Sequence, residues 1–193
     1  MSQKKIILAS GSKIRAKLLE KCGIRFIQIP LNCDEDSIQT TNPKSFAYEA
    51  CKLKYQNAIK LTKDSKSVFS HTPFLVADSV VSIQDQLQRK PKTKEEALKM
   101  LESQSGSEIK IITALILKSR KLELIDISQT IFQLAKFDPQ DLQSYLHSDL
   151  WKDKAGAVMI EGFHHPYIKK QKGLLSCALG LSLEKFLPFF GII

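Results

Sequence analysis

The segment Phe74-Leu75-Val76-Ala77-Asp78-Ser79-Val80-Val81 is apolar and rich in β-branched residues, as is typical of a buried strand, yet it carries one carboxylate. A lone ionised aspartate in such surroundings costs several kcal/mol unless it is paired or coordinates a metal. Asp78 is therefore either a structural residue held by backbone N–H groups or a functional residue. In the second case its partners lie elsewhere in the chain.

Strands and helices alternate in the first half of the chain. A turn at Ser10-Gly11-Ser12 connects a short apolar strand to a helix that ends at Gly23. Asn42-Pro43 is an N-cap followed by proline at the first helical position. The capping box from Thr93 to Glu96 opens a further helix, which Ser105-Gly106 closes. We expect strands at residues 6–9, 25–29 and 74–81, and a helix from residue 43 to 61.

The second half of the chain begins with a long hairpin. Its expected strands are residues 109–117 and 122–134. Asp138-Pro139 begins a helix, and we expect a strand at residues 157–160 and a terminal helix at residues 181–190. The whole pattern predicts an α/β fold with a mixed, mostly central β-sheet flanked by helices, rather than a purely parallel sheet.

The composition indicates a globular chain. A length of 193 residues buries roughly 70% of the unfolded surface, so folding requires neither disulfide nor metal. We expect a single domain over residues 1–193. The four cysteines (Cys22, Cys33, Cys51 and Cys177) have no C-x-x-C or zinc-ligand spacing. The apolar run near the N-terminus is too short for a secretion signal, and no run approaches the ~18 apolar residues of a membrane span. These features predict a reduced, cytoplasmic protein with no membrane partner.

The net charge of +9 is compatible with attraction of a polyanion or with solvated surface lysines. The lysines are spread along the chain, and the densest patches are residues 63–66 and 169–172. We find no clustered basic and aromatic surface, and therefore do not expect nucleic acid as a partner.

Several polar segments are candidates for chemistry. Ser10-Gly11-Ser12 precedes a helix and offers N–H groups and two hydroxyls to a phosphate, although an ordinary serine N-cap has the same pattern and the Walker A spacing is absent. In the acidic loop at residues 34–36, Glu35 is either a ligand of a hard cation or part of a solvated turn. Residues 153–156, with Glu161-Gly162 beyond them, suit close approach to a ligand or a plain tight turn. His164-His165 has no third ligand at a suitable spacing, which favours an ordinary loop pair.

Taken in order, these segments resemble the Maf-like nucleoside triphosphate pyrophosphatase family, which includes the septum formation protein Maf. Leu8-Ala9-Ser10-Gly11-Ser12-x-x-Arg15 is similar to the family's L-A-S-x-S-P-R-R, and Ala77-Asp78-Ser79-Val80-Val81 to its A-D-T-V-V. Further matches are Lys90-Pro91, Ala97 to Leu101, Ser105-Gly106, Thr113, Asp153-Lys154-Ala155-Gly156-Ala157 and Gly180-Leu181. The resemblance extends over almost the whole chain.

The resemblance implies a two-lobed Maf/ITPase-like fold with a nucleotide cleft between the lobes. It implies a hydrolase that converts nucleoside triphosphates to the monophosphate and pyrophosphate with a divalent cation, Mg²⁺ or Mn²⁺. Asp78 would be the general base or a metal ligand, and Glu35 would help to hold the metal. Phosphate and substrate binding would fall to Ser10, Ser12, Arg15, Lys54, Lys90 and Lys154.

Three of the departures from the family pattern concern base selection. Ile14, Ser79 and Glu161 occupy positions that the resemblance links to the nucleobase, and Glu161 replaces a glutamine of the dTTP- and UTP-cleaving members. A glutamine amide donates and accepts, whereas a carboxylate only accepts. We therefore expect noncanonical or modified nucleotides, with guanine or 7-methylguanine as bases, rather than dTTP or UTP.

A second hypothesis assigns the chain to another class. The lost motif residues and the net charge are also compatible with a catalytically weak, nucleotide-binding regulator of cell division and septum formation. That hypothesis predicts binding without turnover. The sequence leaves a homodimer open.

Overall fold

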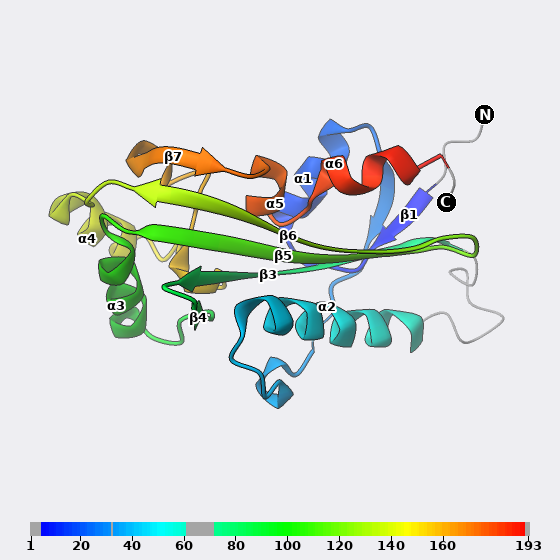
Figure 1. Cartoon of the computed structure of the whole chain (residues 1–193), viewed down its shortest axis with the longest axis horizontal. Helices are drawn as coiled ribbons and strands as arrows, with labels where there is room; N and C mark the ends of the chain where they lie inside the picture. Colours follow the sequence, from blue (N-terminus) through cyan, green and yellow to red (C-terminus); the bar gives the residue numbers. More distant parts are fainter. Residues whose placement is uncertain (1–4, 32, 61–71, 192–193) are drawn as a thin grey trace.

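The computed structural model describes residues 5–31, 33–60 and 72–191. Within these residues seven strands form one sheet in the order β2-β1-β3-β5-β6-β7, with β4 paired to β3 (Figure 1). β1 is parallel to β2 and β3, and every other pair is antiparallel. The predicted mixed sheet flanked by helices is confirmed. The strands are β1 (Lys5–Leu8), β2 (Arg25–Gln28), β3 (Phe74–Ile83), β4 (Gln86–Gln88), β5 (Glu108–Lys118), β6 (Glu123–Leu134) and β7 (Ile168–Lys172).

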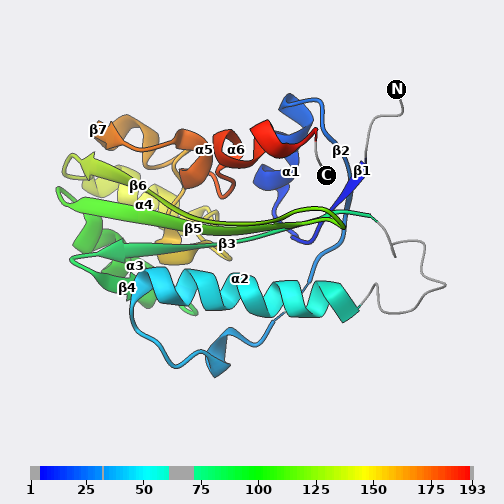
Figure 2. The same cartoon turned by 45° about the vertical axis from the view of Figure 1, so that its right-hand side comes forward.

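Helices cover both faces of the sheet and one of its ends. The α-helices are α1 (Lys13–Lys21), α2 (Pro43–Lys60), α3 (Lys94–Gln104), α4 (Pro139–His147), α5 (Leu175–Ala178) and α6 (Leu183–Phe186). Short 3-10 turns are η1 (Glu35–Ser37), η2 (Ala155–Ala157), η3 (His165–Tyr167) and η4 (Leu187–Phe189). In two views α2 lies on one face and α1, α5 and α6 on the other, with α3 and α4 at the end of the long strands (Figure 1 and Figure 2).

The alternation of side chains along β3 divides the core between these faces. Leu75 and Ala77 pack in the cluster with α1 and α6, whereas Phe74, Val76 and Val80 pack in the cluster with α2. By the same alternation Asp78 faces α2 and Ser79 faces α1. Two consecutive polar residues therefore reach opposite layers of the molecule.

One edge of β3 is open at the position of Asp78. β1 pairs with β3 only through Phe74 and Leu75, and β4 pairs with β3 from Val81 onwards. Between these two ladders, and within the described part of the chain, residues 76–80 have a strand partner only on the β5 side. This gap lies at the carboxyl end of β1, where ligands commonly bind in open α/β sheets.

Three sequence expectations are corrected by the structure. The strand predicted at residues 157–160 is wrong, because Gly156 and Ala157 both have positive φ and the segment forms η2 and a turn instead. The exposed edge strand β7 was missed, since its run of lysines has no apolar face, a composition that protects an edge. The terminal helix predicted at residues 181–190 is shorter, because α6 ends at Phe186 and Pro188 lies in η4.

The other predicted elements are confirmed, with ends that shift by a few residues. The helix from residue 43 corresponds to α2, and Asn42 caps it by accepting from the N–H groups of Lys44 and Ser45 at 3.1 and 3.0 Å. The hairpin corresponds to β5 and β6. The charged patch at residues 63–66 lies outside the described residues. Among the helices that the structure describes, none has the length and apolar character to cross a membrane.

Candidate active site

A cleft of about 930 Å³ opens at the gap beside β3. It brings together segments from both ends of the chain, including the β1–α1 turn, α2, β3 and the residues around η2. Every site residue predicted from the sequence lines this cleft: Ser10, Ser12, Ile14, Arg15, Glu35, Lys54, Asp78, Ser79, Lys90, Lys154 and Glu161.

The turn between β1 and α1 presents the N-terminus of α1 to the cleft. Ser12 is the N-cap of α1 and accepts from the Arg15 N–H at 3.4 Å, and the Ser10 hydroxyl accepts from the Ser12 N–H at 3.2 Å. The Gln28 amide on β2 donates to the carbonyls of Ser10 and Ser12 at 2.8 and 3.3 Å, which ties these carbonyls to β2. Ser12 is thus an ordinary N-cap, and the helix N-terminus it caps also faces the cleft.

Arg15 braces three segments that meet behind this turn. Its Nε donates to the Gly180 carbonyl at 2.8 Å, Nη1 to the Ser10 hydroxyl at 2.9 Å and Nη2 to the Ser79 hydroxyl at 3.0 Å. Burial lowers the pKa of Arg15, and the charge of Asp78 opposes that shift, but a guanidinium stays charged in proteins. Two of its five N–H groups remain for an anion.

The hydroxyl of Ser79 has a fixed direction. Thr113 lies opposite Ser79 in the β3–β5 ladder, and their hydroxyl oxygens are 2.8 Å apart. Because Thr113 donates its hydrogen to the Cys177 carbonyl at 2.8 Å, Ser79 must donate to Thr113 while accepting from Arg15. Ser79 therefore presents only an acceptor lone pair to the cleft.

Asp78 is buried, with 8% of its side chain exposed, and its partner is Lys54 of α2. The Lys54 ammonium forms an ion pair with Asp78 Oδ1 and lies 3.3 Å from Glu35 Oε1, while Lys90 Nζ lies 3.9 Å from the same Glu35 oxygen. Burial alone would lower the pKa of Lys54, but the charges of Asp78 and Glu35 raise it above its ordinary value. The Asp78 carboxylate, which the sequence places in an apolar strand, is therefore paired with a cation.

Glu35 and Asp78 also fit a divalent cation. Two carboxylates from distant segments converge on one cationic position, which the Lys54 ammonium now fills. Mg²⁺ is commonly held by one or two carboxylates together with waters and substrate phosphates. Within residues 5–31, 33–60 and 72–191 there is no group of three His, Cys, Asp or Glu side chains placed for a metal, so phosphate and water would complete the coordination.

Some cleft residues were not found from the sequence. Lys13 and Lys152 line the cleft as further cations, and Gln28 supports the β1–α1 turn from β2. Lys13 stands inside the matched N-terminal motif and could have been selected on position. Gln28 gave no signal, because only the parallel pairing of β1 and β2 brings its amide to the turn.

The two residues of the histidine pair, expected to be an ordinary loop pair, lie in different environments. His165 is exposed, whereas His164 is fully buried, with Nδ1 accepting from the Met159 N–H at 3.2 Å and Nε2 bonded to Gln104 at 2.8 Å. Neither residue lines the cleft. The four cysteines are free thiols, and burial, helped by the charge of Asp78, raises the pKa of Cys51 to about 12.

The burial of His164 predicts a pH dependence of stability. Burial lowers its pKa from 6.5 to about 3, so between these values the unfolded state binds a proton that the folded state does not. Stability should therefore fall as the pH drops below 6.5, by on the order of 1.4 kcal/mol per pH unit from this residue. The free energy of unfolding, measured with urea between pH 7 and pH 5, should fall less steeply with decreasing pH in His164→Gln than in the wild type. His147→Gln, at an exposed position of α4, should keep the wild-type slope; an unchanged slope in His164→Gln would contradict the prediction.

The fold and the cleft define an α/β protein that places a helix N-terminus, several cations and two convergent carboxylates around one cavity. These features together are characteristic of proteins that bind phosphorylated ligands. The model of the family described as "Maf-like protein" matches residues 5–190, and the chain belongs to this family.

Relatives with similar sequences support the same assignment. The chain is 44% identical over 182 residues to a protein of Helicobacter pylori strain G27 named "Nucleoside triphosphate pyrophosphatase", covering 94% of this chain and 93% of that protein. Proteins of the same name in Nitratiruptor sp. and Campylobacter jejuni are 41% and 36% identical, each with 93% of this chain covered and with 95% and 96% of their own lengths covered. A solved structure, protein VC0702 from Vibrio cholerae, is 11% identical, with a TM-score of 0.36 over 84% of this chain and 78% of that chain.

Proposed function

We propose that this protein is a nucleoside triphosphate pyrophosphatase that hydrolyses (d)NTPs to the monophosphate and pyrophosphate. The names of the full-length relatives support the activity. The observation that carries the proposal here is the convergence of Glu35 and the buried Asp78 on the Lys54 ammonium, in the cleft that also contains the helix N-terminus at Ser10 to Ser12. Phosphate transfer requires chiefly positioning and stabilisation of charge, and this cleft contains residues for both.

In the reaction we propose, a water oxygen bonds to the α-phosphorus, and the bond from that phosphorus to the bridging oxygen breaks. Asp78 accepts the proton of the water, and the electron pair of the broken bond leaves with pyrophosphate. Arg15 and the N–H groups of the β1–α1 turn orient phosphate oxygens. Lys54, Lys90 and Lys154 neutralise the charge that develops on the leaving group.

A divalent cation, Mg²⁺ or Mn²⁺, would be held by Glu35 and Asp78 and would polarise the phosphate oxygens when bound. Both carboxylates already share one cation, the Lys54 ammonium. The lysine is therefore the residue that must yield this position to the metal.

We further propose that the substrates are noncanonical or modified nucleotides whose base presents hydrogen-bond donors. Glu161 lines the cleft and its carboxylate only accepts, and the Ser79 hydrogen is committed to Thr113. Ile14 adds an apolar surface to the same cleft. Guanine and 7-methylguanine carry donors on the edge that such a pocket would contact, whereas thymine and uracil present more acceptors.

The test is a panel of triphosphates, including GTP, 7-methyl-GTP, ITP, dTTP and UTP, incubated with purified protein and Mg²⁺ or Mn²⁺. Release of pyrophosphate with the matching monophosphate is expected, fastest for the guanine nucleotides, and a chelator should stop it. Orthophosphate as the product would exclude the proposed bond. Nucleotide binding without turnover of any member would instead favour the regulatory hypothesis.

A further inference from the structure

A buried polar cluster lies behind the cleft wall, outside the cleft itself. Gln88, Gln104 and His164 are 8%, 0% and 0% exposed, in a core that is otherwise apolar. Buried polar side chains are destabilising unless their donors and acceptors are matched. The reason for keeping three of them here must therefore lie in what they hold.

The hydrogen bonds of this cluster have one consistent set of directions. His164 Nδ1 accepts from the Met159 N–H, so Nε2 carries the proton and donates to Gln104 Oε1 at 2.8 Å. The Gln104 amide then donates both hydrogens, to Gln88 Oε1 at 2.8 Å and to the Gly156 carbonyl at 2.7 Å. Gln88 in turn donates to the Ser103 hydroxyl at 2.9 Å. Each polar atom of the Gln104 side chain is used.

Gln104 thereby fixes two points of one segment. It contacts the Gly156 carbonyl directly and, through His164, the backbone of Met159. The Gly156 N–H is held from the other side by the Arg89 carbonyl at 2.9 Å. At Gly156, φ is +59°, and an added Cβ would lie 2.9 Å from Val81 Cβ and 3.0 Å from Gln88 Oε1. The backbone here approaches the cluster as closely as glycine allows.

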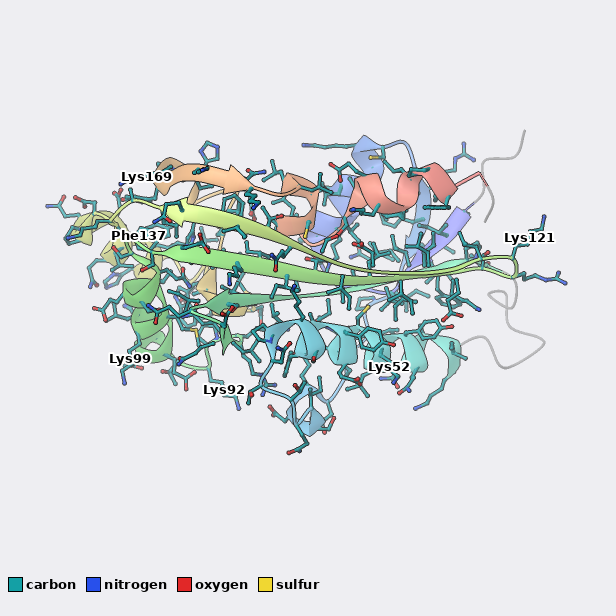
Figure 3. All side chains as sticks on the ribbon, in the orientation of Figure 1. Lys52, Lys92, Lys99, Lys121, Phe137 and Lys169 are labelled. Atoms are coloured by element: carbon teal, nitrogen blue, oxygen red, sulfur yellow. The ribbon has the colours of Figure 1, made fainter. Side chains whose placement is uncertain are left out.

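Aromatic rings cover the His164 side of the cluster. The His164 ring lies 5.4 Å from the Phe137 ring and 5.0 Å from the Phe163 ring, centroid to centroid. Phe137 lies at the end of the sheet near α4 (Figure 3). Water cannot readily replace a lost hydrogen bond in such an enclosed place, so the geometry depends on the side chains themselves.

The segment held in this way forms one wall of the cleft. Lys154 precedes the first fixed point, and Val158, Ile160 and Glu161 lie between or just beyond the two points. We propose that Gln104 is a positioning residue whose buried amide fixes the backbone of residues 154–161 and so sets where Lys154 and Glu161 lie in the cleft. Its effect on substrates rests on the proposed function, whereas its effect on the backbone does not.

The first test is hydrogen exchange of the segment in Gln104→Leu, which keeps the volume and removes all three hydrogen bonds. The matched control is Leu101→Ala, which is buried one turn earlier on α3 in the same core cluster and lowers stability without touching the segment's hydrogen bonds. We expect the amides of residues 154–161 to exchange roughly tenfold faster in Gln104→Leu than in Leu101→Ala. Equal exchange in the two variants would overturn the proposal, whether or not the protein hydrolyses nucleotides.

The second test is base discrimination, the ratio of kcat/KM for GTP to that for UTP. A variant that is merely less folded loses both activities together, so its ratio stays at the wild-type value. We expect Gln104→Leu to change the ratio by roughly tenfold or more, because a misplaced contact of about 1 Å has effects of up to 10²-fold. An unchanged ratio would overturn the role in positioning Glu161. A wild-type protein without turnover would instead count against the proposed function and leave the exchange test decisive.

Discussion

Asp78→Asn should abolish nearly all turnover, with kcat falling roughly 10²- to 10⁴-fold, because the amide cannot accept the proton of the attacking water. The change removes the carboxylate that pairs with the Lys54 ammonium. The pKa of Lys54 should consequently fall, since Asp78 is the largest influence that raises it. The measurement is kcat and KM for the best nucleotide of the panel at saturating Mg²⁺.

The dependence on metal concentration separates the two roles of Asp78. If Asp78 acts mainly as a metal ligand, high Mg²⁺ should restore part of the rate in Asp78→Asn. If it acts as the base, the rate should stay low at every Mg²⁺ concentration. Isothermal titration of the metal into both proteins gives the same answer without turnover.

Asp126→Asn is the control for this substitution. Asp126 lies on β6 of the same sheet, half-buried, and accepts from the Ser128 hydroxyl at 2.6 Å, but it does not line the cleft. Its replacement should leave kcat unchanged. Wild-type turnover in Asp78→Asn would remove Asp78 from the mechanism.

The location of Asp78 was predictable from the sequence, because a carboxylate within an apolar strand needs a partner whatever the fold. The identity of that partner was not predictable from physical reasoning alone. Lys54 is 24 residues away, and only the packing of α2 on the β3 face brings its ammonium to Asp78. The resemblance to the family implied a phosphate-binding role for Lys54, but it did not predict that Lys54 pairs with Asp78.

The positive net charge of the chain is compatible with attraction of a polyanion or with solvated surface lysines. The fold shows which lysines line the cleft and which lie elsewhere. Lys52, Lys92, Lys99, Lys121 and Lys169 lie on separate parts of the structure, away from one another (Figure 3). The lysines that line the cleft are different residues, among them Lys54, Lys90 and Lys154. Sequence spacing gave no means of assigning each lysine to one group or the other, since the cleft draws them from segments 36 and 64 residues apart.

Two of the errors along the chain share a physical origin. The segment at residues 157–160 is apolar enough for a strand, but two successive positive φ angles and the hydrogen bonds of Gly156 turn it into a cleft wall. β7, in contrast, is a strand that was not predicted. Its pairing with β6 comes from backbone hydrogen bonds, and its side chains are mostly exposed. Local patterns predict elements well where burial follows the pattern, and both exceptions are segments whose conformation is set by tertiary contacts.

Arg15→Lys should lower kcat/KM by roughly 10²-fold, because a lysine cannot reproduce three divergent hydrogen bonds and still offer donors to phosphate. In the wild type the guanidinium joins Ser10, Ser79 and the Gly180 carbonyl. A single ammonium reaches at most part of this set, which leaves buried acceptors unmatched and releases the Ser10 turn from β3. The variant should also unfold at a lower temperature.

Kinetics distinguish the two effects of Arg15→Lys. If the arginine contacts substrate phosphate, KM should rise in the fraction that remains folded, and inorganic pyrophosphate should inhibit the variant more weakly than the wild type. If the arginine is only a brace, KM should be unchanged, and so should kcat when it is calculated for the folded molecules. The melting temperature should still fall. Arg25→Lys, at an exposed position of β2, provides the control for the exchange of a guanidinium for an ammonium. It should match the wild type in kcat, KM, inhibition by pyrophosphate and melting temperature. The first pattern would assign Arg15 a contact with the substrate as well as a structural role, because the brace uses three of its five N–H groups and Arg15 lines the same cleft as Asp78.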